Sequence, residues 1–225
     1  MPRLLRRLMG DRTPPPPATP FASPLASLPP SPRDVEQWDK WQIAQTGKAV
    51  NIITDDTRCT ATYMKLTNED VNLALQQRCG CTGLVIFDNT GVYAAHYFKN
   101  PAFLNEDNFR KQVIRGLYSG MKGQRPLKGR FQANTGAHAW LIIPASGDEP
   151  WDLDPYRPQW DWIASTVKDL VRGVTFHESK YNPLDQGIAV DCEILDSSAR
   201  GRMLFKYDSR SGRKYLWSEY KQLFP

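Results

Sequence analysis

A cysteine and a histidine lie fifteen residues apart, at Cys81 and His96, on the two arms of one predicted hairpin. The stretches Gly83–Phe87 and Val92–Phe98 are rich in β-branched and aromatic residues, and the cluster Asp88–Gly91 between them has the composition of a turn. The two stretches are therefore predicted to form antiparallel strands. A thiol and an imidazole brought together in this way can carry out nucleophilic catalysis.

The length of the turn decides how the two side chains meet. With a two-residue loop at Asn89-Thr90, or a four-residue loop over the same turn, Gly83 faces His96 and Cys81 is its diagonal neighbour. With a loop at Asp88-Asn89, Cys81 lies directly opposite His96. Either register keeps both side chains on one face, whereas a three-residue loop or a bulge would separate them. Diagonal neighbours have Cα atoms about 7–8 Å apart, which a histidine side chain can span.

The pairing matters because the thiolate is the attacking form of a cysteine. An unperturbed thiol has a pKa of about 8.5, and a neighbouring imidazolium lowers that pKa. His96 can then give a proton to a leaving amine. Gly80 and Gly83 flank the thiol and let a substrate backbone approach closely. Amide N–H groups near Cys81, such as that of Thr82, can hold an oxyanion.

The same two residues also have a structural interpretation. Buried cysteine commonly behaves as a small hydrophobic residue, and a strand histidine is often part of the core. The corresponding function is that of a noncatalytic effector or protein-binding module.

The tripeptide Gly80-Cys81-Thr82 running into a strand, with His96 on the next strand, resembles the catalytic hairpin of the cytotoxic-necrotizing-factor and CheD-like cysteine deamidases. The stretch also resembles a protein family of filamentous fungi. The resemblance covers about twenty of the 225 residues. It implies a toxin-like hydrolase on a β-sandwich, which deamidates a protein glutamine through a thioester. Cys81 would be the nucleophile and His96 the base and acid.

The chain departs from the deamidase pattern at two places. Arg78-Cys79-Gly80 stands where the family has Leu-Ser-Gly, and Leu75 stands six residues before Cys81, where related enzymes have a threonine. The group that orients His96 is therefore unassigned, and a backbone carbonyl can serve instead.

Further polar residues are candidates for the same site. His138 follows Asn134 at the entrance of a predicted strand and can face the site as a competing base. Asn134 can orient His96 or the substrate amide. His177 lies near a charged turn and has, like His138, no cysteine close to it in sequence.

A zinc site is an alternative use of the thiols. Cys79-x-Cys81 together with Cys59 and His96 can supply four ligands, but the paired Cys-x₂₋₄-Cys spacing of structural zinc sites is missing. The sequence also has no phosphate-binding loop, dinucleotide fingerprint or His-Glu-x-x-His motif. We therefore predict neither a cofactor nor a bound metal.

The rest of the chain predicts an α+β fold, a mixed and mainly antiparallel β-sandwich with about three outer helices. Periodicity and turn residues place further strands and three helices. The strands are Ala49–Thr54, Thr57–Tyr63, Ala137–Ile143, Ile188–Leu195, Arg202–Tyr207 and Lys214–Trp217, and the helices are Thr67–Arg78, Asn105–Gly120 and Pro158–Gly173. The first helix is predicted from a capping-box pattern at Thr67–Asp70. If it ended against Cys81, its dipole would raise the thiol pKa and oppose activation.

Composition divides the chain into a tail and one domain. Residues 1–33 contain ten prolines and four arginines in their first twelve positions, which predicts a disordered basic tail, whereas residues 34–225 form a single deamidase-like α+β domain. The proline runs can dock an SH3-like partner. There is no secretory h-region and no stretch long enough to span a membrane, so a cytoplasmic or secreted location stays open.

The net charge of +5 bears on the partner. Lys122, Arg125, Lys128 and Arg130 form a basic loop that can steer an acidic protein substrate. No nucleic-acid motif with interleaved aromatic residues is present, and nucleic acid is not a predicted partner.

Overall fold

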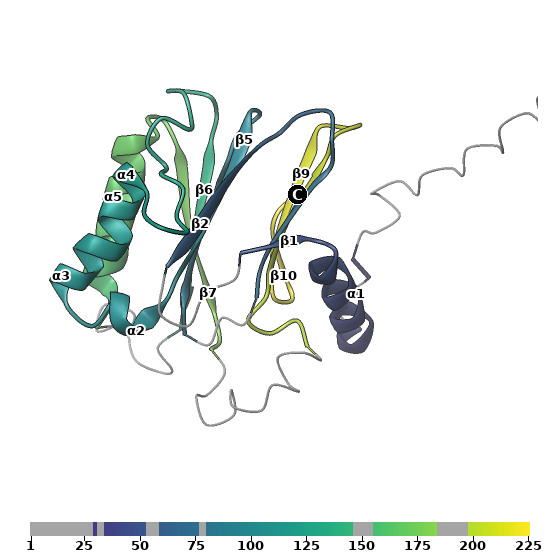
Figure 1. Cartoon of the computed structure of the whole chain (residues 1–225). Helices are drawn as coiled ribbons and strands as arrows, with labels where there is room; N and C mark the ends of the chain where they lie inside the picture. Colours follow the sequence, from purple (N-terminus) through teal and green to yellow (C-terminus); the bar gives the residue numbers. More distant parts are fainter. Residues whose placement is uncertain (1–28, 31–33, 53–58, 77–79, 146–154, 184–197) are drawn as a thin grey trace, which may run out of the picture.

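Two β-sheets pack face to face between two layers of helix (Figure 1). This computed structural model describes residues 29–30, 34–52, 59–76, 80–145, 155–183 and 198–225. The predicted tail, residues 1–33, lies almost entirely outside the described residues, and so does the predicted strand Ile188–Leu195. In the described chain each sheet has five strands.

The first sheet has the order β1-β3-β8-β9-β10 and the second the order β2-β5-β4-β6-β7. Among the described strands, β1–β3 and β6–β7 pair in parallel and the other neighbours are antiparallel. The first sheet comprises β1 (Val50–Asn51), β3 (Val71–Leu75), β8 (Met203–Asp208), β9 (Arg213–Ser218) and β10 (Lys221–Phe224). The second comprises β2 (Thr60–Lys65), β4 (Thr82–Phe87), β5 (Gly91–Tyr97), β6 (His138–Pro144) and β7 (Thr175–Tyr181).

Three cores hold the layers together. The inter-sheet core joins Leu73 and Phe205 of the first sheet to Val85 of the second. The helix-side core lies between the outer face of the second sheet and the helices. A smaller core places Trp38 of α1 on the outer face of the first sheet, on the opposite side of the molecule (Figure 1). The helices are α1 (Val35–Gly47), α2 (Lys99–Ala102), α3 (Glu106–Phe109), the π-helical segment η2 (Arg110–Ile114), α4 (Arg115–Ser119) and α5 (Arg157–Leu170).

The predicted α+β class with a mainly antiparallel sandwich is confirmed. The helix predicted over Asn105–Gly120 is present as α3, η2 and α4, and Asn105 caps it by accepting a hydrogen bond from the Asn108 N–H at 2.9 Å. The helix predicted over Pro158–Gly173 is present as α5. The strand stretches around Asp55-Asp56 are β1 and β2, which belong to different sheets.

The helix predicted over Thr67–Arg78 is wrong, because residues 71–75 form strand β3. Val71, Leu73 and Leu75 alternate, and all three enter the inter-sheet core. Alternation of this kind is the period of a strand and outweighs a capping pattern. No helix therefore directs a dipole at Cys81 from this segment. In the described chain no helix is both long and apolar enough to cross a membrane.

Candidate active site

The β4–β5 hairpin has the register in which Cys81 is the diagonal neighbour of His96. Gly83 pairs with His96, as expected both for a two-residue loop at Asn89-Thr90 and for a four-residue loop. The Asp88 carboxylate fixes the turn by accepting hydrogen bonds from the Thr90 N–H at 2.6 Å and the Gly91 N–H at 3.0 Å. A turn locked in this way prevents a one-residue slip, which would move His96 to the other face.

Both side chains belong to the face between the sheets. Val92 and Ala94 of β5 lie in the inter-sheet core, and His96 follows them at the same alternation. On β4 the same face carries Val85, and Cys81 directly precedes this strand. Extending the alternation back by four residues assigns the Cys81 side chain to the same face. His96 is 0% exposed and Cys81 4% exposed. The thiol and the imidazole therefore share a largely water-free layer.

A row of five residues crosses the second sheet at the level of His96. The paired residues are, from β2 to β7, Thr60, His96, Gly83, Ile142 and Ser179. Gly83 has no side chain, so no side chain of its own stands between Cys81 and His96. On the other flank, the Thr60 hydroxyl is buried and has no hydrogen-bond partner in the described chain. Thr60 is thus the side chain nearest in register to His96, and it was not among the predicted site residues.

A tyrosine holds the backbone that carries the thiol. The Tyr181 hydroxyl donates to the Cys81 carbonyl at 2.7 Å and accepts from the Gly80 N–H at 3.1 Å. Gly80 has a φ of +91°, a conformation that a residue with a side chain rarely adopts. Of the amide groups near Cys81, that of Gly80 is therefore occupied by Tyr181 and is not available to an oxyanion. Tyr181 is 3% exposed and belongs to the inter-sheet core.

Replacing Tyr181 by phenylalanine is expected to lower the free energy of unfolding by about 1–3 kcal/mol, because it leaves two buried backbone groups unpaired. Urea unfolding measures the change. Tyr207→Phe is the matched control, since Tyr207 packs against the same core and its hydroxyl has no hydrogen bond within the described residues. Equal effects of the two substitutions would contradict the bracing role of Tyr181.

Among the other predicted site residues, Thr82 directly follows Cys81, but its side chain points to the helix layer, where its hydroxyl accepts a hydrogen bond from the Trp160 indole N–H at 3.0 Å. His138 pairs with Phe87 at the far end of β4, about 20 Å along the strand from Cys81. Asn134 lies beyond the same end, where its backbone N–H donates to the Arg172 carbonyl. The structure therefore brings together only Cys81, His96, Gly80 and Gly83 of the predicted set.

The second buried thiol, Cys59, lies on the opposite face. Cys59 belongs to the helix-side core, and its burial raises its pKa to about 12. Of the four zinc ligands considered, Cys79 lies outside the described residues. The described chain contains no group of three or more histidine, cysteine or acidic side chains arranged to hold a metal ion.

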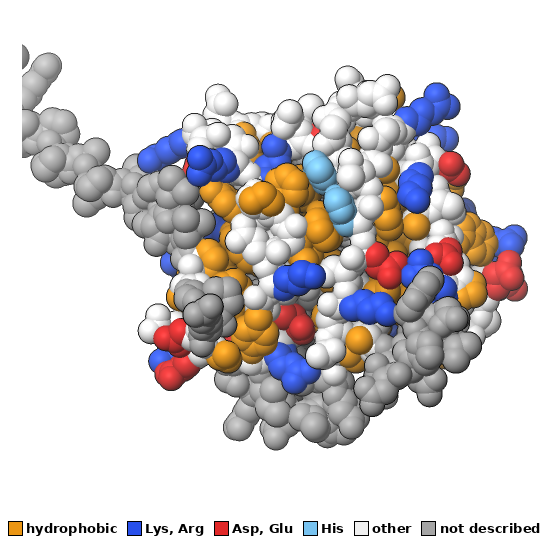
Figure 2. All heavy atoms as spheres, turned by 180° about the vertical axis from the view of Figure 1, so that it is seen from behind, with side chains coloured by type: hydrophobic (Ala, Val, Ile, Leu, Met, Phe, Trp, Pro, Cys, Tyr) orange, Lys and Arg blue, Asp and Glu red, His pale blue; other side chains and the backbone are white. Residues whose placement is uncertain are grey.

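His138 and His177 form a separate aromatic cluster at the surface. The His138 Nδ1 lies 3.3 Å from the His177 Nε2, and the His177 ring stacks on Trp140 with centroids 4.2 Å apart. Figure 2 shows histidine side chains on this face between hydrophobic ones, and these two are the partly exposed histidines of the described chain. Burial lowers the pKa of both rings, and His177 and Lys214 lower that of His138 further.

Stability is expected to depend on pH through this cluster. Both pKa values lie below the ordinary 6.5, so the unfolded chain binds protons more readily, and stability is lost as the pH falls below about 6.5. His177→Gln removes one of these groups and should make the loss between pH 7 and pH 5 smaller. Urea unfolding midpoints of wild type and variant at several pH values measure this loss of stability, with pH 8 as the reference. If the midpoint falls equally with pH in both proteins, His177 does not contribute to the pH dependence of stability.

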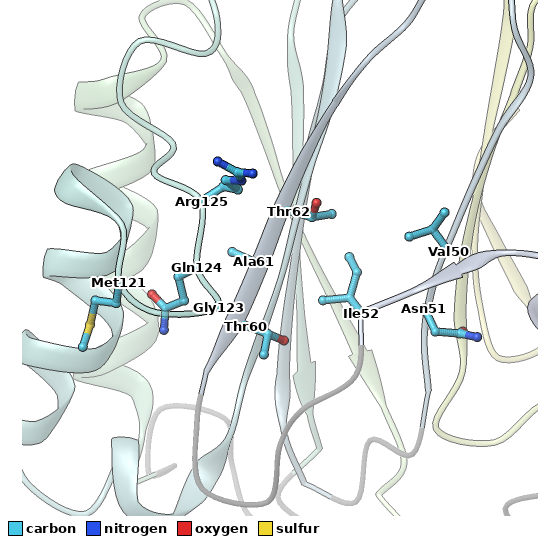
Figure 3. Close-up of a pocket in the computed structure, with 10 residues that line it drawn as sticks. All are labelled: Val50, Asn51, Ile52, Thr60, Ala61, Thr62, Met121, Gly123, Gln124 and Arg125. Atoms are coloured by element: carbon cyan, nitrogen blue, oxygen red, sulfur yellow. The ribbon is translucent and has the colours of Figure 1, made fainter.

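A cavity of about 550 Å³ opens between the edge strands of the two sheets (Figure 3). Val50 and Ile52 line it from the first sheet, Thr60 and Thr62 from β2. The segment from Met121 to Arg125 completes the lining. This segment is bonded to β2, since the Ala61 N–H donates to the Gly123 carbonyl and the Arg125 N–H to the Ala61 carbonyl.

Fold and site together define an α+β sandwich with a thiol and an imidazole on its inner face. No protein-family model matches the chain, and no curated protein matches it.

Proposed function

We propose that this protein is a cysteine-dependent hydrolase that deamidates the side chain of a protein glutamine. The observation that supports this most directly is the β4–β5 register, which makes Cys81 and His96 diagonal neighbours on one face. Diagonal neighbours have Cα atoms about 7–8 Å apart, a separation that a histidine side chain can span. Burial by itself disfavours a thiolate and an imidazolium, so the thiolate of Cys81 depends on the neighbouring His96 to stabilise its charge.

The reaction proceeds in two steps. His96 takes the proton of Cys81, and the sulfur attacks the amide carbon of the glutamine. The carbon–nitrogen bond then breaks, His96 returns the proton to the leaving nitrogen, and ammonia departs to leave a thioester. Water, deprotonated by His96, hydrolyses the thioester to glutamate and restores the thiol. The overall change consumes one glutamine amide and one water and yields one glutamate and one ammonia.

The test is ammonia release from glutamine-containing proteins, combined with mass spectrometry that locates the glutamate formed. Time-dependent conversion of particular glutamines supports the proposal. Absence of conversion across a broad protein mixture, by a folded and reduced sample, overturns it.

A noncatalytic binding module is the second candidate. It is favoured by the aromatic cluster of Trp140, His138 and His177, which is partly exposed and lies far from the thiol. Partly exposed aromatic side chains are typical of protein interfaces. A protein without deamidase activity, whose binding to a partner is lost on Trp140→Ala, would support this candidate.

A further inference from the structure

We infer that the cavity between β1 and β2 binds an acidic peptide segment, with a glutamine side chain directed at Thr60 on the strand next to His96. This inference rests on the proposed function and names its substrate class and entry route. The volume of about 550 Å³ is within the range of ligand sites, about 300–1,000 Å³.

The cavity lies beside the proposed catalytic pair. β1 is the edge strand of the first sheet and β2 that of the second, so the hollow opens at the side of the inter-sheet layer. Thr60 lines the cavity and pairs directly with His96 on the next strand. Neighbouring strands are about 4.8 Å apart, so a group bound at Thr60 is one strand away from His96 and two strands away from β4, the strand that follows Cys81.

A buried and unsatisfied polar group marks the inner wall. The Thr60 hydroxyl oxygen is inaccessible to solvent and has no hydrogen-bond partner within the described residues. A buried hydroxyl without a partner is costly, and a ligand that supplies the missing hydrogen bond removes that cost. A primary amide offers both a donor and an acceptor for this purpose.

The outer wall is suited to an acidic chain. Of the ten residues lining the cavity, Arg125 is charged and none is acidic. In the described chain the Arg125 guanidinium has no carboxylate partner. Lys122 lies within the same segment, and Lys128 and Arg130 follow it. Val50 is 52% exposed and Met121 43% exposed at the rim, which offers apolar contacts to residues on either side of the glutamine. Lys128 and Arg130 lie over the rings of Tyr118 and Tyr63 and keep their positive charge, and a run of positive charge without carboxylate partners attracts acidic ligands.

The experiment measures binding without turnover. A full-length Cys81→Ala protein is titrated against fluorescent peptides that carry one glutamine between glutamates or between lysines, and free L-glutamine is added as a competitor. The glutamate peptide is expected to bind more tightly than the lysine peptide. Arg125→Glu in the same background should weaken it by roughly tenfold or more, because like charges then face each other.

Arg213→Glu is the matched control, since it makes the same charge change on the exposed end of β9, away from the cavity. It should leave the affinity unchanged. Equal losses for Arg125→Glu and Arg213→Glu would show a nonspecific charge effect and overturn the inference. Displacement of the peptide by free glutamine at the same concentration would also overturn the inference, because the cavity would then bind the glutamine amide without the acidic peptide around it.

Thr60→Val tests the inner wall independently. Valine has the shape of threonine without the hydroxyl, so the variant is expected to unfold at a higher temperature and to bind the glutamate peptide more weakly. A more stable variant with unchanged affinity would overturn the role of Thr60 in binding.

The two proposals fail in different ways. If the acidic peptide binds in an Arg125-dependent manner but the wild-type protein releases no ammonia from it, the deamidase proposal fails and the cavity remains an acidic-peptide site. If ammonia is released from acidic and basic peptides alike, with or without Arg125, the deamidase proposal holds and the inference about the cavity fails.

Discussion

Cys81→Ala is expected to reduce glutamine deamidation to the level of buffer, since no other described side chain on this face can form the thioester. His96→Ala should lower the rate by about 10²–10⁴-fold, the usual contribution of a general base and acid. Ammonia release at saturating substrate measures both variants. The loss should appear in kcat, because both residues act in the chemical steps.

Cys59→Ala is the matched control for this prediction. Cys59 is 1% exposed and Cys81 4% exposed, so the two substitutions remove the same atoms from comparably buried positions. Cys59 lies in the helix-side core, away from His96. Its loss should reduce stability but leave the rate per folded molecule unchanged. A similar rate for Cys81→Ala and wild type would exclude Cys81 as the nucleophile.

The pairing of Cys81 with His96 could be predicted from the sequence because it is local. A tight turn and two short strands determine the register, and alternation then assigns each side chain to a face. Asp88 is the residue that makes this turn predictable, because its carboxylate accepts hydrogen bonds from the Thr90 and Gly91 N–H groups.

The surroundings of the pair depend on contacts that sequence spacing does not reveal. Tyr181 is 100 residues from the Cys81 carbonyl that it binds. Thr60 reaches His96 only because β2 pairs with β5 rather than with β1. The chain has Leu75 six residues before Cys81, where related enzymes have a threonine, whereas the structure places Thr60 on the strand next to His96.

Two elements show why local patterns fail. The capping-box pattern at Thr67–Asp70 predicts a helix, whereas the alternation of Val71, Leu73 and Leu75 fits the strand β3 that forms. Helix α1 was not predicted, since its buried side chains, Trp38, Gln42 and Thr46, are mostly polar and form no apolar stripe. In both cases tertiary packing, rather than propensity, decides the structure.

Trp160→Ala is expected to cost about 3–5 kcal/mol of stability, the range for removing a large aromatic side chain from a core. Trp160 is 2% exposed in the helix-side core, and its indole N–H donates to the Thr82 hydroxyl on β4. The substitution removes the packing and leaves a buried hydroxyl without its donor. Because Thr82 directly follows Cys81, the deamidation rate per folded molecule should also fall. Urea unfolding and ammonia release measure the two effects.

Trp162→Ala is the matched control on the same helix. Trp162 is only partly buried and packs at the edge of the core against Phe109 and Arg110. Its loss should cost clearly less stability and leave the rate per folded molecule unchanged. A double-mutant cycle of Trp160→Phe and Thr82→Val then isolates the hydrogen bond between the two side chains. If the bond contributes to stability, the loss of unfolding free energy in the double variant differs from the sum of the two single losses. Additive losses would mean that α5 holds β4 by packing alone, and that the strand carrying the thiol is positioned by its sheet neighbours and by Tyr181.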